Sequence, residues 1–277
     1  MFFERVIWIY TADRNLEKFK QFGLDISRFR LIPNGISRRL SSSPISRADL
    51  GIPETAIVFL FAARSHPEKG WCQTAAAFDR LSGGAAENAY LLMVGRGEEA
   101  DAVGQKYADN ARIMLLGFRS DLDDLLEVSD FTVLPSRFQG ESMPLFLIQS
   151  ILAKVPVIAT NVGQIKELVV GEGRTLGVVI EPIDDDERFV EALHEQMTRA
   201  IRDGLVVAKR SFNAVTQHFS IERCVDQYTE LYQDGGDAAA TRSIQGRVPF
   251  VRPPLVESVK SRDMKKPRSR RALRMVT

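Results

Sequence analysis

The sequence predicts an α/β domain in which a parallel sheet is covered by helices on both faces. Short apolar runs alternate with segments of helical length from about Ala56 to about Pro182. Runs such as Ile57–Ala63 and Phe131–Leu134 are apolar along nearly their whole length. Strands buried on both faces have this character, and alternation of strands with helices favours parallel order.

The first 53 residues are expected to form a smaller unit and a linker. A turn signal at Pro33, Asn34 and Gly35 ends the second of two short apolar runs. Ser37–Pro53 is rich in serine, arginine and proline, as linkers often are. The expected elements before it are strands at Val6–Tyr10 and Phe29–Ile32, with a helix at Arg14–Phe22 between them.

Residues 54–234 are expected to form the main, Rossmann-like domain. Two or three helices should end it, between Asp186 and Gln233, where apolar residues recur at helical spacing. The expected order before them is strand Ile57–Ala63, helix Trp71–Leu81, strand Tyr90–Val94, helix Glu98–Ala108, strand Arg112–Leu116, helix Leu122–Val128, strand Phe131–Leu134, helix Pro144–Lys154, strand Pro156–Ala159, a helix after Gly163, and strand Gly177–Ile180.

The bulk composition is that of a soluble globular protein. The 277 residues are 44% hydrophobic and 26% charged, and the net charge of +1 gives no global field that would attract nucleic acid. The two cysteines, Cys72 and Cys224, are too few and too far apart for a disulfide framework or a zinc site. No apolar run approaches the roughly 20 residues of a membrane span. The first ten residues contain Glu4 and Arg5 and do not resemble a signal peptide, so a cytoplasmic location is expected.

The last stretch, Gly235–Thr277, differs from the rest in composition. It has four prolines, eleven basic residues, three acidic residues and few large apolar groups. These features predict a disordered basic tail. Such a tail could make peripheral contact with anionic lipid at the inner face of a membrane, or could touch RNA. A solvated extension with no partner is the favoured alternative.

The stretch from Ser136 to Glu167 suggests a ligand site. It reads as loop, helix, strand, loop and helix, so both loops should lie at the carboxyl edge of the sheet, where open α/β sheets bind ligands. Pro144 suits the first helical position, and the free N–H groups that follow it are a natural seat for phosphate. Glu141 and Gln149 could each bind hydroxyl groups. On spacing alone, we favour a plainer role, in which Glu141 stabilises the helix start and Gln149 is solvated.

A second candidate is the loop from Arg64 to Gly70, which follows the first strand of the main domain. Its two cations, Arg64 and Lys69, could hold a diphosphate, since arginine suits bidentate phosphate contacts and lysine acts as a point charge. The glycine spacing is not that of a Walker A loop. A surface turn with solvated charges explains the pattern equally well.

Two other signals are weaker. The sequence from Gly95 to Ala100 resembles a dinucleotide fingerprint, but it follows the second strand, and no acid ends the next strand. The three histidines, His66, His194 and His218, have no partners at metal-ligand spacing. We therefore expect neither NAD(P) binding nor a histidine metal site.

Taken together, these segments resemble the C-terminal, donor-binding domain of GT-B glycosyltransferases of the large retaining family 4, also called group 1. The order and spacing of the segments over about 140 residues carry the resemblance. The matching segments are LIPNGI at Leu31–Ile36, FAARSHPEKG at Phe61–Gly70, LMVGRGEE at Leu92–Glu99, LLGFRSDLDDLLEVSDFTVLPS at Leu115–Ser136 and GESMPLFLIQSILAKVPVIATNVGQIKELV at Gly140–Val169.

The resemblance implies a role for each matching residue. Arg64 and Lys69 match the basic pair that neutralises the donor diphosphate as it leaves, and Glu141 matches the first acid of a paired-glutamate motif, which meets the donor sugar. These three residues are the expected catalytic residues. The expected donor-binding residues are Gly117 and Phe118 at the base, Ser142, Met143, Pro144 and Leu145 beside the phosphates and sugar, and Gln149.

The sequence departs from the family in two ways. Gln149 stands where the second acid usually holds the ribose hydroxyls, so nucleotide binding should be weaker or altered. Only about 50 residues precede the donor domain, and residues 1–53 resemble the last strands of an acceptor domain plus a linker. Either this chain is a truncated product of a longer gene, or the missing acceptor half comes from another chain. In both cases the exposed cleft face and strand edges should tend to associate with other molecules.

Three hypotheses follow. In the first, this chain is the donor half of a retaining glycosyltransferase that moves a hexosyl group from a UDP- or GDP-linked sugar to a glycan or lipid-linked acceptor, without a metal ion. In the second, it is a nucleotide-sugar-binding module that transfers nothing alone. In the third, it is an interaction scaffold. The sequence leaves the sugar, the base and the acceptor open.

Overall fold

The computed structural model describes residues 6–171, 174–204, 207 and 209–233. The first five residues and the expected basic tail at Gly235–Thr277 lie outside the described residues. Within the described part of the chain, no helix is both long enough and apolar enough to cross a membrane.

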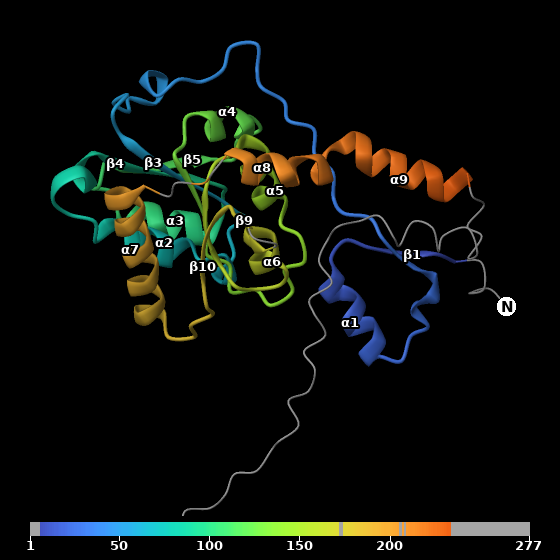
Figure 1. The fold of residues 1–277 in the computed structure, drawn as a ribbon. Coiled ribbons are helices and arrows are strands. Elements are labelled where there is room, and N and C mark those ends of the chain that lie inside the picture. The colour runs from blue at the N-terminus through green and yellow to red at the C-terminus, as the bar shows by residue number, and fades with distance from the viewer. Residues whose placement is uncertain (1–5, 172–173, 205–206, 208, 234–277) are drawn as a thin grey trace, which may run out of the picture.

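Six parallel strands form the central sheet, in the order β10-β7-β6-β3-β4-β5 (Figure 1). The predicted parallel sheet is thus confirmed. The chain runs outward from β3 to β5 and then returns to the other side of β3. The strands are β3 (Ile57–Ala62), β4 (Ala89–Val94), β5 (Ile113–Gly117), β6 (Phe131–Leu134), β7 (Val157–Thr160) and β10 (Gly177–Ile180).

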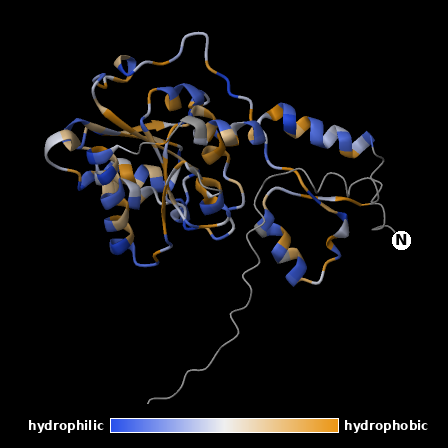
Figure 2. Cartoon of the chain, in the orientation of Figure 1, coloured by the Kyte–Doolittle hydropathy of each residue, from blue (hydrophilic) through white to orange (hydrophobic). Residues whose placement is uncertain are grey.

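Alternate residues of β3 enter two separate cores, which is why this strand is apolar throughout. Val58 and Leu60 pack into a core with α4 (Leu122–Glu127), α5 (Leu145–Ala153), α6 (Ile165–Val169) and α8 (Lys209–Thr216). Phe59 and Phe61 pack into the other core with α2 (Trp71–Asp79), α3 (Glu98–Lys106) and α7 (Asp186–Asp203). Helices therefore cover both faces, as predicted, and Figure 2 shows the apolar colour concentrated on the central strands.

The predicted boundaries are close to those observed. β6 and β10 have the predicted bounds, whereas α2 ends at Asp79 rather than Leu81. An antiparallel hairpin of β8 (Val170–Gly171) and β9 (Arg174–Thr175) is absent from the prediction. A two-residue strand carries no periodicity that could indicate it.

The first unit contains two parallel strands, β1 (Trp8–Tyr10) and β2 (Phe29–Leu31), joined through α1 (Asp13–Gln21). Figure 1 shows this unit set apart from the six-stranded sheet. The ring of Phe29 lies 6.0 Å from that of Trp8 and 5.0 Å from that of Phe19. Trp8 is nevertheless 49% exposed and Phe22 is 81% exposed. The unit therefore has a small aromatic core and leaves apolar surface in contact with solvent.

Residues 37–53, the expected linker, form an ordered segment that we call the strap. Arg38 pairs with Glu127 over 2.5 Å, and Arg47 pairs with Asp130 over 2.9 Å. Arg47 also donates to three main-chain carbonyl groups, at the end of α4 and just before β3. The strap is therefore held against the main domain.

In the part of the chain that the structure describes, three helices follow β10, within the range that the sequence predicts. α7 packs on α2, and α8 packs on α5. The last helix, α9 (Ile221–Gln233), begins beside Gly35, where an added Cβ would lie 2.6 Å from the Cβ of Cys224. The N–H of Ile36 donates to the carbonyl of Phe219 over 2.8 Å. The turn after β2 and the start of α9 are thus joined, and α9 extends away from the sheet (Figure 1).

Candidate functional site

The candidate site lies at the carboxyl edge of β3 and β6, where the order of the strands reverses. Ligands of open α/β sheets bind in the crevice at such a switch point. The loop after β3 carries Arg64 and Lys69, and the loop after β6 carries Glu141. The main-chain N–H of Arg137 donates to the carbonyl of Glu68 over 2.7 Å, so the two loops are directly connected.

Lys69 and Glu141, which are 72 positions apart in the sequence, form an ion pair between these loops. The Ser136 hydroxyl donates to the same Glu141 oxygen over 3.0 Å. The Lys69 and Glu141 side chains are only 15% and 11% exposed, so salt screens their attraction weakly. The Lys69 ammonium also lies 5.4 Å from the centre of the Phe138 ring. The structure therefore brings two of the three expected catalytic residues together.

Two glycines allow the loops to approach this closely. Gly70 has a φ of +77°, and a Cβ there would lie 2.8 Å from the carbonyl oxygen of Pro135. Gly163, in the loop after β7, has a φ of +60° and lies against the main-chain carbonyl group of Glu141. The left-handed conformation suits glycine, and the lack of a side chain permits the contact. Three loops therefore meet at Glu141.

Arg64, the third expected catalytic residue, lies at the start of the β3–α2 loop and is exposed. Among the described residues, its guanidinium group has no hydrogen bond or ion pair, so its charge is available to a ligand. Its main-chain carbonyl accepts a hydrogen bond of 3.0 Å from the indole N–H of Trp71. The loop thus presents one free cation and one cation paired with Glu141.

The expected base-binding residues, Gly117 and Phe118, follow β5. Gly117 has a φ of +64°, and its carbonyl accepts from the N–H of Gly95 over 2.8 Å. Phe118 is 71% exposed, and the guanidinium carbon of Arg96 lies 5.6 Å from the centre of its ring. This face offers an aromatic ring and a cation to a ligand at the end of β5, which is separated from β6 by β3 and β4.

The start of α5 differs by one residue from the prediction. Pro144 is the N-cap, with extended backbone, and Leu145 is the first helical residue. The ψ of Pro144 is 127°, a value typical of extended backbone, so the helical conformation begins at the next residue, Leu145. Met143 is buried, Ser142 and Pro144 are half-buried, and Leu145 is 55% exposed. The first N–H groups of the helix still face the loop edge.

Gln149 lies one helical turn after Leu145 and is half-buried. Within the described part of the chain, its amide makes no hydrogen bond to protein. It shares the Leu145 side of α5, whereas Ile148 is fully buried. The amide is therefore available to bind the hydroxyl groups of a ligand.

The glycines of the Gly95–Ala100 sequence have a packing role. A Cβ on Gly95 would lie 2.6 Å from the indole ring of Trp71. The start of α3 is capped by Ser65, whose hydroxyl accepts from the N–H groups of Glu99 and Ala100 over 2.8 and 3.1 Å. These helix-terminal N–H groups, which a dinucleotide phosphate would use, are already satisfied.

The histidines are dispersed in the structure. His66 Nδ1 accepts from the N–H of Glu68 over 3.4 Å, and His194 Nδ1 lies 3.2 Å from the carbonyl of Ala77. His218 lies in the turn before α9. Among the described residues, no group of three or more His, Cys, Asp or Glu side chains could hold a metal ion.

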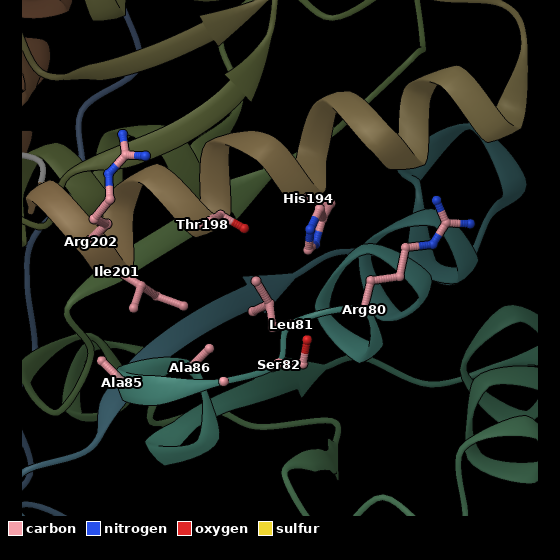
Figure 3. Close-up of a pocket in the computed structure, with 10 residues that line it drawn as sticks. Arg80, Leu81, Ser82, Ala85, Ala86, His194, Thr198, Ile201 and Arg202 are labelled. Carbon is pink, nitrogen blue, oxygen red and sulfur yellow. The ribbon is translucent and has the colours of Figure 1, made fainter.

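A hollow of about 350 Å³ lies at the opposite, amino edge of the sheet (Figure 3). Its walls come from the segment between α2 and β4 and from the second half of α7. It is remote from the Lys69–Glu141 pair and is not part of the candidate site. Among its lining residues are Arg80, Leu81, Ser82, Ala86, His194 and Ile201.

Three residues that support the site carry no role in the sequence analysis. Ser136 holds Glu141, Trp71 holds the carbonyl of Arg64, and Asn34 donates its side-chain N–H to the carbonyl of Met143 over 3.4 Å. In the sequence, Asn34 is recognisable only as part of a turn signal. The other two contacts depend on strand order and loop folding, which the sequence pattern does not specify.

Comparison with known proteins gives consistent matches. A family model described as "Glycosyl transferases group 1" matches residues 56–199. The UDP-Gal:alpha-D-GlcNAc-diphosphoundecaprenol alpha-1,3-galactosyltransferase of Escherichia coli is 27% identical over 240 residues, which are 83% of this chain and 60% of that protein. The chain therefore spans less than two thirds of this curated relative.

Solved structures share the fold. Sucrose-phosphate synthase from Thermosynechococcus elongatus matches with a TM-score of 0.67 and 23% identity, over 82% of this chain and 57% of that one. Anabaena HepE in complex with UDP and glucose matches with a TM-score of 0.66 and 21% identity, over 82% and 63% of the two chains. These similarities show that the architecture is that of GT-B proteins.

Proposed function

Because this chain belongs to the group 1 glycosyl transferases, we propose that it supplies the donor-binding half of a retaining transferase. The donor is a nucleotide-diphosphate sugar, and a hexosyl group passes from it to a glycan or lipid-linked acceptor. Residues 54–234 are the donor domain, and residues 1–53 belong to the acceptor side together with the linker. The name of the E. coli relative, which includes UDP-Gal, favours UDP over GDP.

One observation carries the proposal. Lys69 and Glu141 meet at the switch point of the sheet, and Arg64 lies exposed on the same loop as Lys69. A carboxylate beside two cations is suited to a sugar that is leaving a diphosphate. The carboxylate contacts the sugar, and the cations contact the phosphates.

The chemistry follows from this arrangement. When the bond between the anomeric carbon and the diphosphate oxygen breaks, the electron pair remains on the phosphate and negative charge develops there. Fixed cations and helix-terminal N–H groups stabilise that charge without reorganisation. Lys69 can serve both Glu141 and a phosphate because an ammonium group has three donors. Side chains can supply this stabilisation, so the proposal requires no metal ion.

The other expected donor contacts are assigned by the same proposal. Gly117 and Phe118 line the base, and Gln149 binds the ribose hydroxyls as a neutral amide. Ser142, Met143, Pro144 and Leu145 border the phosphates and the sugar. The exposed ring of Phe118 beside Arg96 is suited to a planar base.

We propose that the acceptor binds to a surface that lies outside the described residues. A glycan or lipid-linked acceptor would bind through a domain that faces the donor site. A cytoplasmic location agrees with the two free cysteines. We also propose that the basic tail makes peripheral contact with the inner face of a membrane. We do not propose nucleic acid as a partner.

Calorimetric titration of the purified chain with UDP, GDP and ADP at millimolar reach tests the proposal. We expect one nucleotide to bind, and we expect the double variant Arg64→Ala/Lys69→Ala to lose that binding. The matched control is Arg199→Ala/Arg202→Ala, which removes the same charge from the far end of α7. Binding by the first double variant that equals the parent's would refute the assignment of the phosphate site.

Gln149 favours a second candidate function, a module that holds a nucleotide sugar without transferring it. An amide lacks the charge assistance that the family's acid supplies. Transfer from UDP-sugars, measured with the purified chain and lipid-linked or glycan acceptors, separates the two. Nucleotide binding without transfer would support the binding module. A folded chain that binds no nucleotide would favour the interaction scaffold.

A further inference from the structure

We infer that Trp71 is a positioning residue for the diphosphate cations, because its indole N–H fixes the main chain of Arg64. This inference rests on the proposed function of the same site. It concerns a residue that the ligand does not touch. Trp71 is the first residue of α2 and is fully buried.

The indole closes the loop that carries both cations. Its Nε1 donates to the carbonyl of Arg64 over 3.0 Å, so the residue after the loop holds the residue that begins it. Lys69 lies only two positions before Trp71. The two cations therefore sit at the two ends of a loop whose ends are tied together.

Packing leaves the indole little freedom. The rings of Trp71 and Phe61 meet edge to face, with their centres 4.8 Å apart. On another side, the α-carbon of Gly95 approaches so closely that a Cβ would lie 2.6 Å from the indole ring. The φ of Gly95, +143°, also favours glycine. The N–H is thus aimed at Arg64 by its surroundings.

The other end of the loop is fixed independently. The N–H of Lys69 donates to the carbonyl of His66 over 2.9 Å. The hydroxyl of Thr74, which is buried, donates to the carbonyl of Gly70 over 2.6 Å. The indole bond is therefore the tie that transmits the position of α2 to Arg64.

Removing the N–H should cost affinity through Arg64. A net hydrogen bond in a folded protein is worth a factor of about 2 to 12 in an equilibrium constant, so Trp71→Phe should weaken UDP binding by about that factor. If Trp71 acts only by holding Arg64, the same substitution in an Arg64→Ala background should change affinity little. A residue that merely supports the fold would act equally in both backgrounds.

The experiment is a double-mutant cycle of Trp71→Phe and Arg64→Ala, with UDP affinity measured by calorimetry. Phe78→Leu is the control, since Phe78 is also fully buried in α2 but lies seven positions, about two helical turns, after Trp71. It should lower the melting temperature and leave UDP affinity unchanged. Parent-like affinity in Trp71→Phe, or equal weakening in both backgrounds, would overturn the inference.

Amide hydrogen exchange gives a readout that needs no nucleotide. Exchange in the segment 64–69 should accelerate in Trp71→Phe and remain unchanged in Phe78→Leu. Unchanged exchange in Trp71→Phe would refute the tie. Faster exchange in a chain whose parent binds no nucleotide would support the tie and reject the proposed function instead, so the two failures are distinguishable.

If Trp71→Phe does not fold, the indole itself can be followed. The chain has two tryptophans, so a Trp8→Phe variant leaves a single indole N–H signal. Trp8 lies in the first unit and is 49% exposed. A shift of the remaining signal during UDP titration would support the coupling, and an unchanged signal at saturation would overturn it.

Discussion

The α-carbon of Gly163 lies against the main-chain carbonyl group of Glu141. A Cβ at Gly163 would come within 2.5 Å of the carbonyl carbon and nearer still to the oxygen. The φ of Gly163, +60°, costs other residues about 1–2 kcal/mol. The position of the Glu141 loop therefore depends on the absence of a side chain at Gly163, in the neighbouring loop after β7.

The substitution Gly163→Ala should displace the Glu141 loop. We expect donor turnover to fall by about 100-fold, because a misplacement of about 1 Å at a reacting centre has that order of effect. The matched control is Gly204→Ala, since Gly204 has a φ of +63° but nothing within 4 Å of an added Cβ. In this control, the free energy of unfolding should fall only by the cost of the left-handed backbone conformation, about 1–2 kcal/mol. Equal turnover in the two variants would contradict this prediction.

Ser136→Ala should free the Glu141 carboxylate from its buried hydrogen bond. We expect a loss of about 1 kcal/mol in the free energy of unfolding. We also expect kcat for transfer to fall more than the donor KM rises, because Glu141 contacts the sugar in the proposed function. Ser150→Ala is the control, since the Ser150 hydroxyl is equally buried and donates to the carbonyl of Phe146 over 2.8 Å. Unfolding in urea and steady-state kinetics with a UDP-sugar would measure both effects, and an unchanged kcat in Ser136→Ala would argue against the assigned role.

Gln149→Glu should tighten nucleotide binding. Hydrogen bonds to a charged acceptor are worth about 1 kcal/mol more than neutral ones, which corresponds to an increase in affinity of about five- to tenfold. Calorimetric titration with UDP measures this change. Gln196→Glu, at a half-buried position in α7, adds the same charge away from the site and should have no effect. Weaker binding in Gln149→Glu would mean that Gln149 does not face the ribose.

The first unit should open at alkaline pH. Burial, followed by the charge of Asp13, raises the pKa of Tyr10 to about 12, and Arg30 opposes this shift in part. The folded unit therefore holds the phenol proton more tightly than the unfolded chain, whose tyrosine pKa is about 10. The resulting stabilisation is complete below about pH 10 and is lost as the pH rises to about 12.

Tyr10→Phe tests this pH dependence. Exchange protection of β1 and β2, followed from pH 9 to 12, should decline in the parent and decline less in Tyr10→Phe. Tyr232→Phe, at an exposed position in α9, should behave as the parent does. Identical profiles for the parent and Tyr10→Phe would show that Tyr10 does not control the opening.

The sequence predicts the sheet well because both faces of each central strand are buried. β6 and β10 have the predicted bounds, since an apolar run between polar loops marks both ends of each strand. The order of the strands does not follow from such runs. It determines that the loops of Lys69 and Glu141 are neighbours, so their ion pair could be expected only from the family resemblance.

The contacts that hold the site are less predictable still. Trp71 reads as an apolar helix residue, and its N–H partner is defined only when the loop folds back. Gly163 reads as a turn residue, and its approach to Glu141 depends on the packing of two loops. The composition of the strap, rich in serine, arginine and proline, predicts only a linker, yet paired charges on α4 and at β6 hold it in place.

The strap also limits where the molecule can bend. Because residues 37–53 are bound to the main domain, movement of the first unit must pivot before Ser37. The last described helix, α9, begins at the same place, where Gly35 and Ile36 contact the segment 219–224. A pivot of the first unit at this junction would move Asn34, and with it the hydrogen bond that Asn34 donates to the carbonyl of Met143 just before α5.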